Sequence, residues 1–96
     1  MEVSSTSEFE KWFEFQEVRI RTIIDERVSR IEEFDHFGSW RPLGNRIAEL
    51  KWKSGIRVYF SRIATKRILL IWGGFKNGQK KDIKKAKEIL ERYVNS

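Results

Sequence analysis

The stretch from Glu49 to Tyr59 contains the residues best suited to chemistry in this chain. Its sequence, ELKWKSGIRVY, alternates apolar with charged or polar residues on both sides of a Ser-Gly pair. Because side chains of a β-strand point to opposite faces with a period of two, the pattern predicts a hairpin with one apolar and one cationic face. Lys51 and Arg57 fall on the cationic face, where an ammonium and a planar guanidinium together can hold the oxygens of a phosphate group.

The register of this hairpin decides whether the two cations meet. A loop of two residues, Ser54 and Gly55, would place the apolar side chains of each strand opposite the charges of the other. A loop of three residues, in which Gly55 supplies the left-handed residue of a G1 bulge, sets Lys51 opposite Arg57 and keeps the apolar side chains together. A slip of one residue would spoil this match, so we predict the three-residue loop.

The predicted pair of Lys51 and Arg57 has an energetic cost. Like charges directly opposite one another in a sheet are unfavourable by roughly 0.2–1 kcal/mol. An anion such as phosphate between them would make the pair favourable. The alternative is that both long side chains simply diverge into water.

The positive charge of the chain is concentrated in its second half. The formal net charge is +6. Residues 1–48 carry 7 Lys/Arg and 10 Asp/Glu, whereas residues 49–96 carry 13 Lys/Arg and 4 Asp/Glu. A positive field over the half that contains the hairpin attracts polyanions such as nucleic acid, and it would equally attract an acidic protein.

Composition limits the kinds of site that the chain can form. Ninety-six residues correspond to one domain, residues 1–96. The absence of cysteine and the single histidine exclude disulfides, thiolate metal sites and His-rich metal centres, and we expect no metal or other cofactor. No run approaches the ~18 apolar residues of a membrane span, and no signal-peptide pattern is present, so we expect a soluble, cytoplasmic protein without a membrane partner.

Helical periodicity dominates the first third of the chain. After a possible short edge strand over Met1–Ser5, Ser5 and Glu8 have the spacing of a capping box. Apolar residues then recur every three or four positions over residues 7–34, which predicts a helical hairpin or one bent helix. The Gly, Pro, Ser and Asn residues of Asp35–Arg46 predict a loop.

The remaining chain predicts a sheet followed by a helix. After the hairpin and a turn near Ala64–Lys66, the wholly apolar Ile68–Trp72 is typical of an interior strand covered on both faces, ended by Gly73-Gly74. From about Gly78 an amphipathic, lysine-rich pattern predicts a helix. The order is (β)ααβββα, an α+β fold in which two N-terminal helices and a C-terminal helix pack on a small antiparallel sheet.

Three blocks of sequence, in this order and spacing, carry a family resemblance. They are Gly38-Ser39-Trp40-Arg41-Pro42-Leu43-Gly44, Ala48–Lys51 with Gly55–Phe60, and Gly73–Lys76 running into Asp82-Ile83 and Ala86-Lys87. With these blocks the chain resembles the RelE/ParE superfamily of type II toxin–antitoxin toxins, especially the HigB-like group called addiction-module killer proteins. The resemblance covers nearly the whole chain.

The resemblance implies a small toxin neutralised by a cognate antitoxin. A helix-turn-helix, HigA-like antitoxin is the expected partner, and operator DNA would be reached only through it. RelE-like members cleave messenger RNA on the ribosome, which predicts a ribosome-dependent endoribonuclease with mRNA and the ribosome as partners. ParE-like members share the fold and inhibit DNA gyrase, which is the alternative. A third possibility is a purely regulatory co-repressor. Because one fold serves several activities, the site must decide.

Under this resemblance the cationic hairpin face is a candidate RNA-cleaving site. Internal transfer from a 2′-hydroxyl needs a general base, cations for the charge of the phosphorane, and a general acid. We expect Lys51, Arg57 and Lys76 to hold the phosphate oxygens. Glu49 is the candidate base, at a strand position where many RelE-like toxins carry a basic residue. The alternative is that Glu49 only neutralises the cations or hydrogen-bonds Tyr59.

Other residues are expected to donate the proton or to contact RNA. Tyr59 and Lys53 are candidates for the general acid or for positioning the RNA. Trp40 can stack on a base, which is worth ~1–3 kcal/mol, or it can pack over the edge of the core. The residues expected to bind RNA outside the reacting centre are Lys53, Trp40, Arg62, Lys80 and Lys81.

Overall fold

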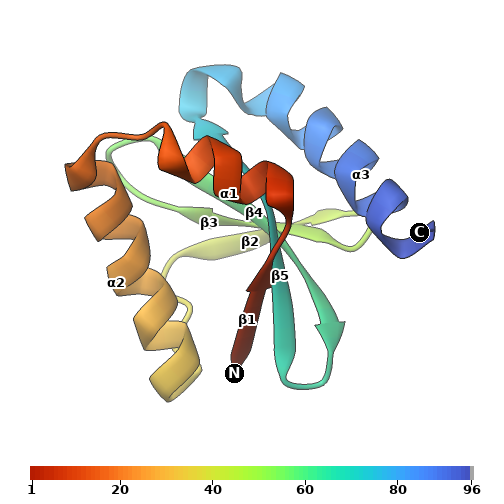
Figure 1. The fold of residues 1–96 in the computed structure, drawn as a ribbon, viewed down its shortest axis with the longest axis horizontal. Coiled ribbons are helices and arrows are strands. Elements are labelled where there is room, and N and C mark those ends of the chain that lie inside the picture. The colour runs from red at the N-terminus through yellow and green to blue at the C-terminus, as the bar shows by residue number, and fades with distance from the viewer. Residues whose placement is uncertain (96) are drawn as a thin grey trace.

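A computed structural model describes residues 1–95 of the chain, so Ser96, the last residue of the predicted domain, lies outside the described residues. The elements follow the order βααββββα (Figure 1). They are β1 (Glu2–Ser5), α1 (Ser7–Glu14), α2 (Val18–Phe34), β2 (Trp40–Gly44), β3 (Ile47–Lys51), β4 (Ile56–Ala64), β5 (Arg67–Phe75), a 3₁₀ turn (Lys76–Gly78) and α3 (Gln79–Asn95).

The strands form one sheet in the order β1-β5-β4-β3-β2. Neighbouring strands are antiparallel except β1 and β5, which are parallel. Apolar residues of α1 and α2 share one core cluster with one face of the sheet, and those of α3 share a second cluster with the other face. The predicted α+β class is confirmed, with helices on both faces. No helix within residues 1–95 is long and apolar enough to cross a bilayer.

The predicted loop over Asp35–Arg46 was wrong, because its second part forms strand β2. Trp40 pairs with Leu50 and Pro42 with Ala48 in an antiparallel ladder. Proline is tolerated there because β2 is an edge strand, where a missing N–H costs no ladder hydrogen bond. The proline and glycine residues that predicted a loop instead belong to a short edge strand and to the tight turn that follows it.

The predicted hairpin register is confirmed. Glu49 pairs with Tyr59, and Lys51 with Arg57. The Gly55 N–H donates to the Trp52 carbonyl at 3.0 Å, and Gly55 has a φ of 102°, in the left-handed region. The G1-bulge loop therefore holds both cations on one face of the sheet.

The ends of two predicted elements differ from the expectation. The β5 strand continues through Gly73 and Gly74 to Phe75 rather than ending at the glycines. A Cβ atom on Gly73 would lie 2.3 Å from the Trp12 ring, so glycine is needed for close packing rather than for chain termination. At the start of α1 the capping side chain is Thr6, not Ser5, because the Thr6 hydroxyl accepts from the Phe9 N–H at 2.9 Å.

Candidate functional site

A cavity of about 490 Å³ lies at the end of the sheet where the β3–β4 hairpin turns. This volume is within the range of roughly 300–1,000 Å³ that is usual for ligand sites. The cavity brings together four of the predicted site residues, all of them cationic, with three that were not predicted. Its lining residues are Arg27, Ser39, Lys51, Trp52, Lys53, Arg57 and Lys76.

The guanidinium of Arg57 is held rigidly by the hairpin itself. Its Nη1 donates to the carbonyl oxygens of Trp52 at 3.0 Å and of Ile56 at 2.9 Å. Its Nε lies 3.4 Å from the Oε1 atom of Glu49. Within residues 1–95, the hydrogen bonds of this guanidinium are both made by Nη1, so Nε has only the ion-pair contact with Glu49 and Nη2 is not used. Arg57 is only 7% exposed and still lines the cavity, so Nη2 is the donor left for a ligand.

The carboxylate of Glu49 is enclosed by its partners. Glu49 is fully buried, and Nε2 of Gln79, the first residue of α3, donates to both of its oxygens at 2.8 and 2.7 Å. Nε of Arg41 lies 3.4 Å from Oε1, at the same distance as Nε of Arg57. Glu49 does not line the cavity. The structure therefore brings the predicted base beside Arg57 but beneath the beginning of α3, in the neutralising arrangement that was the alternative.

The buried ion pair of Glu49 and Arg57 reduces the expected repulsion between Lys51 and Arg57. The two residues are cross-strand neighbours, as predicted, and both line the cavity. The Arg57 side chain does not extend into water, because it turns to Glu49 and to backbone carbonyls. The charge opposite Lys51 is thus partly neutralised from behind, which reduces the cost of the like-charge pair.

The other two predicted cations of the cavity come from turns. Lys53 is exposed in the hairpin turn, and Lys76 is exposed directly after β5. The Lys76 N–H donates to the Gly55 carbonyl at 2.8 Å, which fixes the end of β5 against the hairpin turn. This bond explains how Lys76 reaches the same cavity as Lys51.

Arg27 is a cavity residue that sequence reasoning missed. It comes from α2, and its Nη1 and Nη2 atoms donate to the carbonyl oxygens of Phe37, Ser39 and Lys51 at 3.1–3.2 Å. Its guanidinium lies 4.2 Å from the Trp52 ring centroid, a cation–π contact. A signal was available, because Arg27 occupies a position of the apolar stripe of α2, between Ile24 and Ile31, where a cation is unexpected.

Tyr59, a predicted acid, lies in the core beneath α3. It is fully buried in the cluster that contains Leu69 and Ile89. Its hydroxyl has no hydrogen-bond partner within residues 1–95. Burial raises the pKa of the phenol, and the negative charges of Asp82 and Glu49 raise it further. A raised pKa makes the phenol a weaker proton donor.

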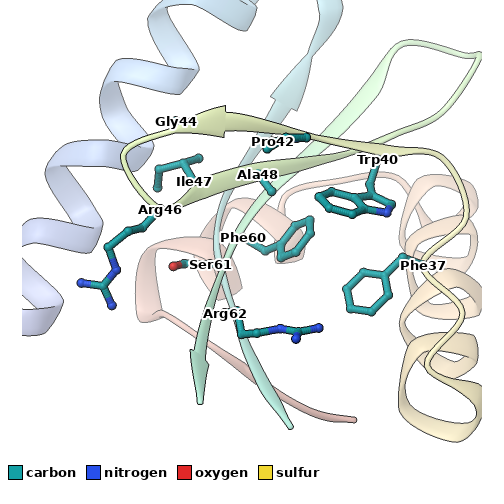
Figure 2. A pocket seen from close by; sticks show the side chains of 10 residues that line it. All are labelled: Phe37, Trp40, Pro42, Gly44, Arg46, Ile47, Ala48, Phe60, Ser61 and Arg62. Atoms are coloured by element: carbon teal, nitrogen blue, oxygen red, sulfur yellow. The ribbon is translucent and has the colours of Figure 1, made fainter. Parts of the chain in front are cut away.

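The remaining predicted RNA-binding residues lie outside the cavity. Trp40 and Arg62 line a separate groove (Figure 2). Trp40 pairs with Leu50, whose side chain belongs to the α1–α2 core, so this groove is on the face of the sheet opposite Glu49. Lys80 and Lys81 are exposed in the first turn of α3.

Comparisons with known proteins connect this chain to one relative and one fold. No family model matches the chain. An uncharacterized protein of Haemophilus influenzae is 31% identical over 94 residues, which are 95% of this chain and 94% of that protein. The crystal structure of the isolated Escherichia coli RelE toxin matches with a TM-score of 0.64 at 16% identity, over 77% of this chain and 82% of RelE. The chain therefore belongs to the same protein family as the Haemophilus protein, and it has the fold of the RelE toxin.

Proposed function

We propose that this chain is the toxin of a type II toxin–antitoxin module and that it cleaves messenger RNA on the ribosome. The fold shared with the RelE toxin supports the toxin assignment. The observation that carries the proposal is the fixed guanidinium of Arg57, with its free Nη2, in a cavity that also holds Lys51 and Lys76. Donors that are held in place before the substrate arrives stabilise developing charge most effectively.

The bound group would be a phosphodiester of RNA. Nη2 of Arg57 and the ammonium groups of Lys51 and Lys76 would contact its non-bridging oxygens. During internal transfer the 2′-oxygen forms a bond to phosphorus while the bond from phosphorus to the 5′-oxygen breaks. The three cations would stabilise the additional negative charge of the phosphorane.

Lysines would carry the two proton transfers. Lys51, Lys53 and Lys76 are the lysines that line the cavity, whereas Glu49 is enclosed by Gln79. The neutral amine of Lys53, which is not assigned to the phosphate oxygens, would accept the proton of the 2′-hydroxyl, and the ammonium group of Lys51 or Lys76 would donate a proton to the leaving 5′-oxygen. We assign Glu49 as a positioning residue, which holds Arg57 and does not touch the RNA.

The expected partners follow from the proposed activity. The ribosome would present the mRNA, and the exposed Lys80 and Lys81 of α3 would contact ribosomal RNA backbone. A HigA-like antitoxin with a helix-turn-helix domain would neutralise the toxin in the cytoplasm and would connect it to operator DNA. A small helix-turn-helix protein encoded beside this chain would support this pairing.

Induced expression with mapping of transcript 5′ ends tests the proposal. The wild-type chain should produce new 5′ ends within translated codons. The variant Lys51→Ala/Lys76→Ala should lower the yield of these ends by about 10²-fold or more without changing the melting temperature, because both side chains lie outside the core.

A matched variant separates a local effect from a change of net charge. Lys84→Ala/Lys87→Ala removes the same charge from α3, away from the cavity, and should retain most of the cleavage. Cells that express the wild-type chain could accumulate gyrase–DNA breaks but no new transcript ends. This result would contradict the proposed nuclease activity and would support a ParE-like gyrase inhibitor.

A further inference from the structure

A second cavity lies on the α2 side of the sheet, away from the phosphodiester site. Its volume is about 540 Å³. The rings of Phe37, Trp40 and Phe60 lie together on one side of it, and Pro42 and Ala48 line it from β2 and β3 (Figure 2). We call this cavity the aromatic groove. Trp40 is 49% exposed, and an exposed apolar surface of this kind is typical of an interaction site.

The geometry of the rings fits apolar side chains better than nucleic-acid bases. Phe37 and Trp40 are inclined by 51°, and Trp40 and Phe60 by 61°, with centroids 6.3 and 6.2 Å apart. Phe60 is only 5% exposed. The rings therefore pack against one another at steep angles and do not form a series of parallel, open faces on which successive bases could stack.

The strand that borders the groove is poorly suited to pairing with another strand. Strand β2 is at the edge of the sheet, where an extended segment of a partner could add itself. Pro42 lies in the middle of β2 and has no N–H to donate to such a strand. A partner is therefore expected to insert side chains into the groove, as an amphipathic helix does.

The positive charge around the groove favours a negatively charged partner. Arg46 and Arg62 line it, both are exposed, and neither makes an ion pair within the described residues. A second copy of a chain with net charge +6 would be repelled. Arg46 also has a φ of 67°, a conformation that favours glycine, so the arginine is kept at the β2–β3 turn at a cost in strain.

We propose that the aromatic groove binds an acidic amphipathic helix of a partner protein. Large apolar side chains of the helix would lie against Phe37, Trp40 and Phe60. Carboxylates on the flanks of the helix would meet Arg46 and Arg62. This interaction uses neither Lys51 nor Arg57, so it stands independently of the proposed nuclease activity.

A synthetic peptide provides the probe for this surface. It has about 15 residues, with leucines at i, i+3, i+4 and i+7 and glutamates on the flanks. Added to the ¹⁵N-labelled protein, it should cause saturable chemical-shift changes at the indole N–H of Trp40 and the amides of Ala48 and Phe60. A peptide with lysines in place of the glutamates, or with serines in place of the leucines, should bind about tenfold more weakly.

Charge reversal on the protein provides the matched test. Arg46→Glu/Arg62→Glu should weaken binding of the glutamate peptide about tenfold and should favour the lysine peptide. Lys80→Glu/Lys84→Glu makes the same change of net charge on α3 and should leave the affinity nearly unchanged.

Three results would overturn the proposal. The first is that the glutamate peptide causes no saturable chemical-shift changes at the groove. Both charge-reversal variants could weaken binding equally, which would indicate only a general field. A single-stranded oligouridylate could shift the signals of Trp40 and Phe60 and compete with the peptide, which would make the groove an RNA surface.

Discussion

The two faces of the sheet hold their candidate functional groups in different ways. On the α3 face, Arg57 is buried, and Glu49 and two backbone carbonyls fix its guanidinium. On the α2 face, Arg62 is exposed, and Trp40 contacts other rings only at inclined angles. A reacting phosphate requires donors at fixed positions, whereas a docking surface can adjust its side chains to the partner.

This difference arises from alternation along the strands of the β3–β4 hairpin. Glu49 faces α3, and its neighbours Ala48 and Leu50 face the α1–α2 core. Two surfaces with different chemistry are therefore separated by one residue in sequence and by the thickness of one sheet. Substitutions at adjacent positions should therefore affect different functions.

The largest effect is expected from Arg57→Ala. It removes the proposed phosphate donor and leaves the buried Glu49 carboxylate with Arg41 as its one guanidinium partner among the described residues. The free energy of unfolding should fall by about 3–5 kcal/mol, because removing one partner of a buried ion pair is costly. Urea denaturation would measure this loss, and toxicity should disappear.

The double variant Arg57→Ala/Glu49→Gln separates folding from activity. It removes the buried charge together with its partner, so most of the stability should return. Toxicity should not return, because Nη2 of Arg57 is still missing. A stable double variant with wild-type toxicity would show that Arg57 is not the essential cation.

The hairpin was predictable from sequence because its constraints are local. The alternation around Ser54-Gly55 permits one register that keeps apolar side chains together, and this register places Lys51 beside Arg57. The two-sided sheet was equally readable from the apolar run Ile68–Trp72. Strand β2 was not, since Pro42 and its neighbouring glycines predict a loop, and only the edge position makes them compatible with a strand.

The rest of the site depends on contacts between distant segments. Gln79 and Glu49 are 30 residues apart, and only the placement of α3 brings the amide onto the carboxylate. Sequence reasoning therefore could not see that the candidate base is enclosed. Arg27 could have been found, because a cation in the apolar stripe of a helix needs a buried partner, and its partners are three loop and strand carbonyls.

An intermediate effect is expected from Gln79→Ala. The substitution removes both hydrogen bonds to Glu49, and a bond to a charged group is worth roughly 1.5–3 kcal/mol. Thermal unfolding should show a loss of this size. Cleavage should fall only a few-fold, because Arg57 retains its bonds to the hairpin carbonyls.

The neighbouring exposed residue supplies the control for Gln79. Lys80→Ala is also at the beginning of α3 but has no role in the buried network, so the stability should hardly change. If both variants lost equal stability, the effect would belong to the helix terminus and not to Glu49.

A smaller effect of opposite sign is expected from Arg46→Gly. Glycine adopts the left-handed conformation of this turn without strain, so the free energy of unfolding should rise by about 1 kcal/mol. The same variant should bind the glutamate peptide a few-fold more weakly and should cleave RNA normally. An unchanged peptide affinity would remove Arg46 from the docking surface while leaving Arg62 to be tested.

The smallest effect at neutral pH is expected from Tyr59→Phe. The hydroxyl has no hydrogen-bond partner within residues 1–95, so its removal should leave the free energy of unfolding at pH 7 nearly unchanged. Burial raises the pKa of the phenol above its ordinary value of 10.0. The folded state therefore retains this proton more tightly than the unfolded state. The contribution of the protonated phenol to the free energy of unfolding is fully present below pH 10, and it is lost as the pH rises toward the folded-state pKa.

Measurements at two pH values separate the structural from the catalytic role of Tyr59. Urea denaturation at pH 7 should give similar free energies of unfolding for the wild type and Tyr59→Phe. At pH 11 the variant should be more stable than the wild type. Cleavage by the variant at pH 7 should be unchanged, whereas loss of a general acid would lower it by roughly 10²–10⁴-fold. A loss of that size in a fully stable variant would mean that α3 moves away during the reaction and exposes the phenol to RNA, and the assignment of the acid to a lysine would then be wrong.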